Sequence, residues 1–221
     1  MKKFSYRIVF ILFIIPFIVG PCYAQEVSPL MHFSIFAGGA FPEGDFGSTS
    51  GEKAGYAKTG FSAMVQGDKS LSESIYWTSS ISLAINSLDE SSMRSATGVS
   101  GMNITTTNYY TTWVMTGVGF ETPVSPTVKI YGSAQLGLLV SKFPDVTISY
   151  NGISVNQTAD MATAFAYGFG AGFWLNNFNL GLRYYTGQPK YKETASYGNN
   201  SYSVNEDLPA TVLQVMFGIR F

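Results

Sequence analysis

The single histidine of the chain, His32, is the side chain best suited to act as a general base near neutral pH. Candidate partners for nucleophilic catalysis are the serines and acids of SLDESS (87–92) and the acids of PEGD (42–45). A general base must lie within about 3 Å of the group it deprotonates, directly or through one water. His32 stands near the start of a predicted strand, whereas both segments follow the ends of predicted strands. We therefore expect a packed polar role for His32 and no enzymatic activity.

No other motif predicts a cofactor or a metal site. GFGAGF (168–173) lacks the glycine spacing of a dinucleotide site, and crowding inside a narrow fold explains its glycines better. Glu43, Asp45, Asp89 and Glu90 could bind divalent cations, but solvated loop charges are the favoured interpretation. The segment at 189–207 is rich in Tyr, Asn and Ser, which make adaptable contact surfaces and equally make ordinary exposed loops.

The N-terminus has the layout of a secretory signal peptide. Lys2, Lys3 and Arg7 precede an apolar run at 8–20, and a small-residue cleavage site follows at Ala24. The run is shorter than the roughly 20 residues of a membrane-spanning helix. Cys22 raises the alternative of a lipoprotein, against which Pro21 directly before it argues. Residues 1–24 are predicted to be removed, leaving one domain at residues 25–221 without cysteine.

The remaining chain is exported and poor in charge. Charged residues make up 12% of the whole sequence, about half the value of soluble proteins, and no basic patch predicts binding of nucleic acid. Eight segments alternate in the period of two that is typical of strands with one apolar face. They are residues 30–41, 59–67, 74–88, 107–121, 127–142, 160–175, 178–188 and 208–221.

Long and short connections between these segments alternate strictly. The long ones are residues 42–58, 89–106, 143–159 and 189–207, and the short ones are residues 68–73, 122–126 and 176–177. An up-and-down meander would gather all long loops at one end, and pairing of the last strand with the first would remove both sheet edges. The predicted fold is all-β, an eight-stranded antiparallel up-and-down transmembrane β-barrel.

The small residues of the segment at 160–175 suit the crowded interior of such a barrel. Its phenylalanines, on the opposite face, are then expected to contact lipid. The same parity sends a set of polar residues inward, where we expect a plug in which Glu121 pairs with Lys129 across a hairpin and His32 lies near Arg220. This luminal polar cluster consists of His32, Glu121, Lys129, Gln135, Arg183, Gln214 and Arg220.

Two further sets of residues follow from the same topology. Aromatic side chains near the short turns predict a belt at the periplasmic interface, formed by Phe33, Trp77, Phe120, Phe173, Phe178 and Phe221. The chain ends on LQVMFGIRF (213–221), whose apolar residues fall at every second position. These residues are Leu213, Val215, Phe217, Ile219 and Phe221.

The signal peptide, the eight alternating segments and the closing FGIRF resemble the small OmpA/OmpX-like outer-membrane β-barrels. FSIFAGGAFPEGDFG (33–47) is similar to their first strand and loop. The resemblance implies a Gram-negative outer membrane, both mature termini in the periplasm, and contacts with lipid and lipopolysaccharide. It also implies that the terminal alternation is the signal read by the barrel-assembly machinery. We expect the chain to lack the peptidoglycan-binding module that is attached to some members of this family.

Three functional hypotheses remain open at the level of the sequence. The favoured one is a structural or surface-interaction barrel whose long extracellular loops contact an unidentified cell-surface partner. The second is a narrow porin-like pore for small solutes. The third is a soluble lipocalin-type barrel that binds a ligand inside, which would require the apolar faces to point inward.

Overall fold

The computed structural model describes residues 31–51, 53–99, 101–198 and 200–221. The predicted signal peptide at 1–24 lies outside the described residues. Within the described ranges, no helix is long and apolar enough to cross a membrane.

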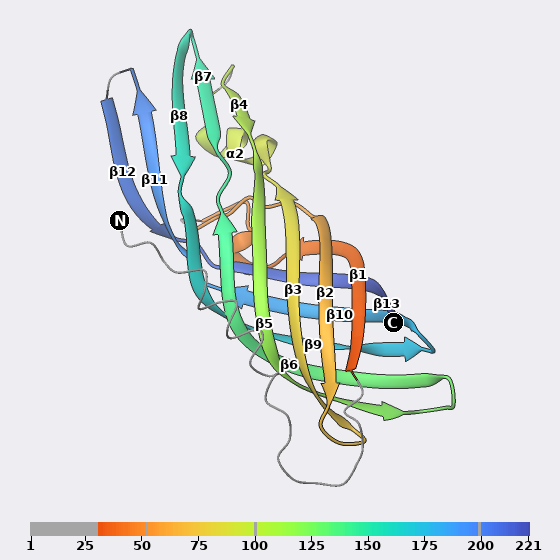
Figure 1. Cartoon of the computed structure of the whole chain (residues 1–221). Helices are drawn as coiled ribbons and strands as arrows, with labels where there is room; N and C mark the ends of the chain where they lie inside the picture. The colour runs from red at the N-terminus through yellow and green to blue at the C-terminus, as the bar shows by residue number, and fades with distance from the viewer. Residues whose placement is uncertain (1–30, 52, 100, 199) are drawn as a thin grey trace.

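Eight strands form a closed antiparallel barrel in the order β1-β13-β10-β9-β6-β5-β3-β2 (Figure 1). Each predicted segment is one barrel strand, so the expected meander and its closure are confirmed. Closure is made by β1 and β13, and the Phe221 amide extends it by donating to the Phe33 carbonyl over 2.8 Å. The barrel strands are β1 (Met31–Pro42), β2 (Gly60–Ser70), β3 (Ile75–Ser87), β5 (Asn108–Pro123), β6 (Val128–Lys142), β9 (Met161–Leu175), β10 (Phe178–Gly187) and β13 (Ala210–Arg220).

Strand β9 shows why the two faces of the wall differ. Its phenylalanines point outward, with Phe169 56% exposed, while its three glycines and most of its alanines point inward. A Cβ atom built on Gly168 would lie 2.2 Å from the ring of Tyr185, and one on Gly170 would lie 2.8 Å from the Arg183 side chain. Glycine is therefore required at these positions because large side chains of β10 occupy the space.

The lumen is more apolar than the expected polar plug. In the half toward the long loops, the interior is filled by Tyr109, Trp113, Leu139 and Tyr185, each fully buried. The rings of Trp113 and Tyr185 stack with their centroids 5.6 Å apart. Strand parity predicted which polar side chains face inward, but it did not indicate that apolar side chains pack the half of the lumen toward the long loops.

Three of the four long connections contain strands where the sequence pattern predicted loops. They form a separate sheet, here called the outer sheet, in the order β12-β11-β8-β7-β4. Figure 1 shows it rising from the end of the barrel opposite the short turns. Its strands are β4 (Asn103–Thr106), β7 (Val146–Tyr150), β8 (Ile153–Ala159), β11 (Lys190–Tyr197) and β12 (Asn200–Asp207).

The hairpin β7–β8 carried a readable signal for this sheet. Its turn is Asn151-Gly152, with φ of 50° and 79°. Two left-handed residues in succession are the requirement of the type I′ hairpin turn that Asn-Gly favours. The remaining elements of the long connections are η1 (Gly44–Phe46) and helix α2 (Glu90–Thr97).

Opposite faces of the outer sheet differ in chemistry. Directly paired residues share a face, so the register defines both sets. One face is polar, and its neighbours bond to one another, as in Thr147–Asn156 at 3.0 Å and Thr194–Ser203 at 2.9 Å. The other, here called the apolar face, continues the barrel interior. Its apolar and aromatic members are Ile104, Val146, Ile148, Tyr150, Ile153, Val155, Ala159, Tyr191, Ala195, Tyr197, Tyr202 and Val204.

Candidate functional site

The short-turn end of the lumen holds the titratable residues that the strand parity predicted there. All seven members of the predicted luminal cluster lie on inward-facing positions of their strands. Burial increases along the barrel axis. Lys129 at the mouth is half exposed at its side chain, whereas Arg183 is 2% and Gln214 0% exposed.

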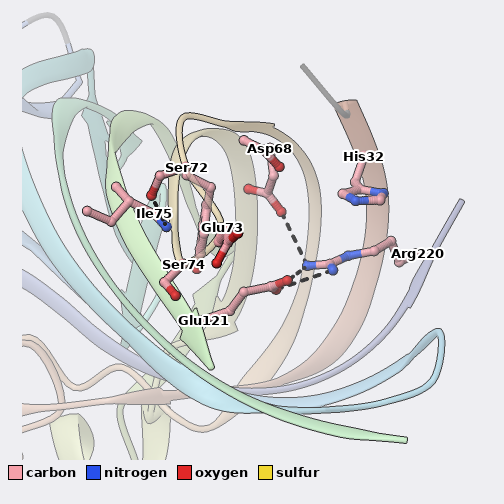
Figure 2. A pocket seen from close by; sticks show the side chains of 10 residues that line it. His32, Asp68, Ser72, Glu73, Ser74, Ile75, Glu121 and Arg220 are labelled. Atoms are coloured by element: carbon pink, nitrogen blue, oxygen red, sulfur yellow. Dashed lines mark hydrogen bonds and ion pairs between the residues drawn. The ribbon is translucent and has the colours of Figure 1, made fainter. Parts of the chain in front are cut away.

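Glu121 pairs with two bases at this mouth. Its Oε1 accepts from Lys129 Nζ over 2.8 Å, which is the expected hairpin pair. Its Oε2 lies 3.3 Å from both terminal nitrogens of Arg220. His32 and Arg220 line the same small pocket, as closure of β1 on β13 requires (Figure 2). One carboxylate therefore joins β5, β6 and β13.

Asp68 completes this group, although the sequence pattern did not predict it there. It was assigned to the turn at 68–73, but β2 continues to Ser70 and leaves residues 71–74 as the turn. Asp68 thereby faces inward, 3% exposed, with its Oδ2 3.8 Å from Arg220 Nη2. Figure 2 shows the Arg220 guanidinium between Asp68 and Glu121. The alternation of Met64, Gln66 and Asp68 was the signal that could have extended the strand.

Arg183 lies deeper and is linked to the same group through an amide. Its Nη1 donates to the Tyr131 hydroxyl over 2.7 Å, and its Nη2 donates to Gln66 Oε1 over 3.3 Å. Gln66 Nε2 in turn donates to Asp68 Oδ1 over 2.9 Å. The guanidinium also lies 4.9 Å from the centre of the Tyr131 ring, an arrangement that stabilises a buried cation.

These contacts form one continuous chain across the lumen, here called the charge ladder. In order it comprises Arg183, Gln66, Asp68, Arg220, Glu121 and Lys129. Positive and negative groups alternate along it, which is the arrangement that makes charges tolerable in a low-dielectric interior. The ladder ties together β2, β5, β6, β10 and β13, so it fixes opposite walls of the barrel relative to one another.

The neighbours of His32 differ from those expected in one respect. PEGD and SLDESS lie at the other end of the barrel, as expected. The pocket around His32 nevertheless contains Asp68 and the hydroxyl groups of Ser70, Ser72 and Ser74. Ser72 Oγ accepts from the Ile75 amide over 3.2 Å and thereby caps the turn. Among the hydrogen bonds of the described residues, none joins His32 to a serine.

Two of the four acids considered as cation ligands, Asp89 and Glu90, have local structural partners. Asp89 caps helix α2 by accepting from the Ser92 amide over 3.1 Å, and it lies 3.4 Å from Lys58 Nζ. Hydrogen bonds from the Ser91 hydroxyl and the Ser92 amide hold the pKa of the Asp89 carboxyl well below its usual range. Glu90 accepts from the amide and the hydroxyl of Thr106 in β4. Both carboxylates therefore anchor α2 to its neighbours.

The outer surface of the barrel carries the other two predicted sets. All six aromatic residues lie on outward-facing positions within a few residues of the short-turn end. Five of them are between 41% exposed, for Phe173, and 70% exposed, for Phe221, while Trp77 is half-buried. The alternating apolar residues of β13 also face outward, and Phe217 among them is 65% exposed.

No known protein family and no curated protein matches the chain in sequence. Solved structures do match in fold. A major outer membrane protein from Thermus thermophilus superposes with a TM-score of 0.54 at 10% identity, over 87% of this chain and 100% of that one. The outer membrane protein OprG from Pseudomonas aeruginosa superposes with a TM-score of 0.51 at 15% identity, over 87% and 97%. The chain has the fold of a small transmembrane β-barrel, eight-stranded and antiparallel, that is also found in outer-membrane proteins.

Proposed function

We propose that the protein is an integral outer-membrane barrel with a sealed lumen, which serves a structural or surface-interaction role through its outer sheet. The observation that carries this proposal is that side chains occupy the interior along its length. Trp113 and Tyr185 fill the half toward the loops, and the charge ladder fills the half toward the short turns.

Insertion in lipid is supported by the outward faces of the strands. Large apolar side chains such as Phe33, Phe165 and Phe217 are 59%, 64% and 65% exposed. Exposure of such a continuous apolar surface to water is unfavourable, whereas contact with the acyl chains of a bilayer is favourable. A soluble lipocalin-type barrel needs the reverse arrangement, so this alternative loses its support.

The orientation we propose places the short turns and both mature termini in the periplasm and the outer sheet outside the cell. Bacterial outer-membrane barrels have short periplasmic turns and longer extracellular loops. We further propose that the aromatic belt lies at the periplasmic interface, and that the partners are lipid, lipopolysaccharide and the barrel-assembly machinery. No catalytic role is proposed for His32.

Fractionation and conductance together test this function. We expect the protein in the outer-membrane fraction, and we expect no stable single-channel openings when it is reconstituted into planar bilayers. Recovery from the soluble periplasm would refute the membrane assignment. Reproducible openings would favour the narrow pore instead, because a sealed lumen offers no continuous path for water and ions.

Deletion of Phe221 is expected to reduce assembly in cells far more than folding in detergent. In the folded barrel Phe221 is 70% exposed and contributes one backbone bond, to Phe33; loss of one such bond costs about 1 kcal/mol. Its larger role follows from the resemblance of the terminal alternation to an assembly signal. Membrane-inserted protein per cell and the midpoint of urea unfolding in detergent measure the two effects.

Phe178→Ala is the matched control for this deletion, since Phe178 is 63% exposed on the same surface and lies outside the terminal strand. We expect this variant to assemble normally. Comparable assembly defects in the two variants would reduce Phe221 to an ordinary lipid-facing residue.

A further inference from the structure

The apolar face of the outer sheet is covered on one side only. Glu90 of α2 accepts from the amide and the hydroxyl of Thr106, so the helix lies against the edge strand β4. Ile104 and Val146 are 2% and 1% exposed there. Ala159 and Tyr191, at the barrel end of β8 and β11, are also buried, at 9% and 0%. Farther from the barrel the cover is missing, and the exposed members are Tyr150 at 42%, Ile153 at 50%, Tyr197 at 53%, Tyr202 at 74% and Val204 at 47%.

A buried carboxylate borders this uncovered region. Glu193 is 4% exposed, although it stands opposite the exposed Val204 in the sheet. Its Oε2 accepts from Gln157 Nε2, while its Oε1 has no hydrogen-bond partner among the described residues. An unpartnered buried carboxylate oxygen is unfavourable, and such an oxygen is the natural counterpart of a cationic donor.

The charged side chains of this face are all acidic among the described residues. Its charged members among the described residues are Glu193 and Glu206, since Lys190 and Lys192 fall on the opposite parity of β11 and thus on the polar face. Burial, followed by the nearby Glu206, raises the pKa of the Glu193 carboxyl. A positive charge brought to the face would relieve this penalty.

We propose that the uncovered part of the apolar face binds a segment of another protein that presents a lysine or arginine among apolar side chains. The cationic group would pair with Glu193 Oε1, and the apolar neighbours would lie on Tyr202 and Val204 of the adjacent strand β12. Exposed tyrosine rings beside carboxylates also favour a cation through its attraction to the ring face. This proposal rests on the proposed function, because it names the chemistry of the surface partner.

The size of the face favours a polypeptide over a free amine. Neighbouring strands are about 4.8 Å apart, so the region from β7 to β12 is roughly 14 Å wide. A small amine would leave most of its tyrosine and aliphatic surface uncovered. An extended or helical segment with several apolar side chains would cover it.

The test uses the mature chain in nanodiscs of zwitterionic lipid, with empty nanodiscs subtracted. The probe is a blocked pentapeptide with a central lysine between phenylalanines and terminal leucines, and its partner carries Nε-acetyllysine instead. A charge-assisted hydrogen bond should make the lysine peptide bind about tenfold more tightly. Titration calorimetry measures both affinities, and butylamine in a third titration is expected not to bind.

Variants assign the preference to the face. Glu193→Gln should abolish the preference for lysine, and Tyr202→Ser should weaken both peptides. Glu73→Gln, a matched change at the opposite end of the molecule, should alter neither. If Glu193→Gln does not fold, Glu206→Gln is the second charge variant. We expect it to reduce the preference for the lysine peptide.

Equal binding of the two peptides, no binding of either, or a lysine preference that survives in the charge variants would overturn the inference. If butylamine bound as tightly as the lysine peptide, the site would be assigned to a free amine, and the proposal of a protein partner would be refuted. A sealed barrel in the outer membrane that fails these titrations would leave the proposed function intact.

Discussion

Replacement of Asp68 by Asn is expected to lower the free energy of unfolding by about 3–5 kcal/mol, the usual loss when one partner of a buried ion pair is removed. Asp68 is 3% exposed and lies between two cations of the charge ladder, Arg220 directly and Arg183 through Gln66. The amide keeps the shape of the side chain but removes the negative charge that both guanidiniums face. Urea unfolding of the purified barrel in detergent or lipid measures the loss.

Glu121→Gln is the comparison variant within the same ladder. Of its two partners, Lys129 is half exposed at the mouth, where water screens the charge that remains, and Arg220 keeps Asp68 as a second carboxylate. We therefore expect a smaller loss, about 1–2 kcal/mol, between the values of exposed and buried pairs. A loss at Glu121 that equals or exceeds the loss at Asp68 would show that the ladder is not graded by burial.

Replacement of Trp113 by Ala is expected to lower the free energy of unfolding by about 3–5 kcal/mol, the usual effect of deleting a buried aromatic side chain. Trp113 is fully buried and stacks on Tyr185, in the half of the lumen without ladder charges. The substitution leaves a cavity beside the Tyr185 ring, which loses its stacking partner. Unfolding by urea gives the loss, and planar-bilayer recording shows whether the variant conducts.

Trp77→Ala serves as the control, because Trp77 sits on the outward face of β3 at the short-turn end, beside lipid in the proposed orientation. It should lose less stability, since lipid can occupy the vacated space. Equal losses at the two tryptophans would contradict the assignment of Trp113 to the packed interior. Conduction by the Trp113 variant, with none from the Trp77 variant, would identify Trp113 as part of the seal.

The strands of the barrel were readable from the sequence because each has one apolar face, and a period of two is a local property. The alternation of Phe165 and Phe169 with small residues in β9 also indicated which face points inward, since only small residues fit beside the large side chains of β10. The pairing of Glu121 with Lys129 followed from hairpin geometry, because the two residues flank one short turn.

Only the tertiary structure decided which side chains meet across the lumen and which strands pair in the outer sheet. Asp68 and Arg220 are brought together by closure of the barrel, and the ladder to Arg183 depends on the stagger of strands that no local pattern encodes. The outer sheet was missed because its strands pair between connections far apart in sequence, as β8 does with β11. The apolar surroundings of Trp113 are set by side chains from several strands, whose common depth exists only in the folded barrel.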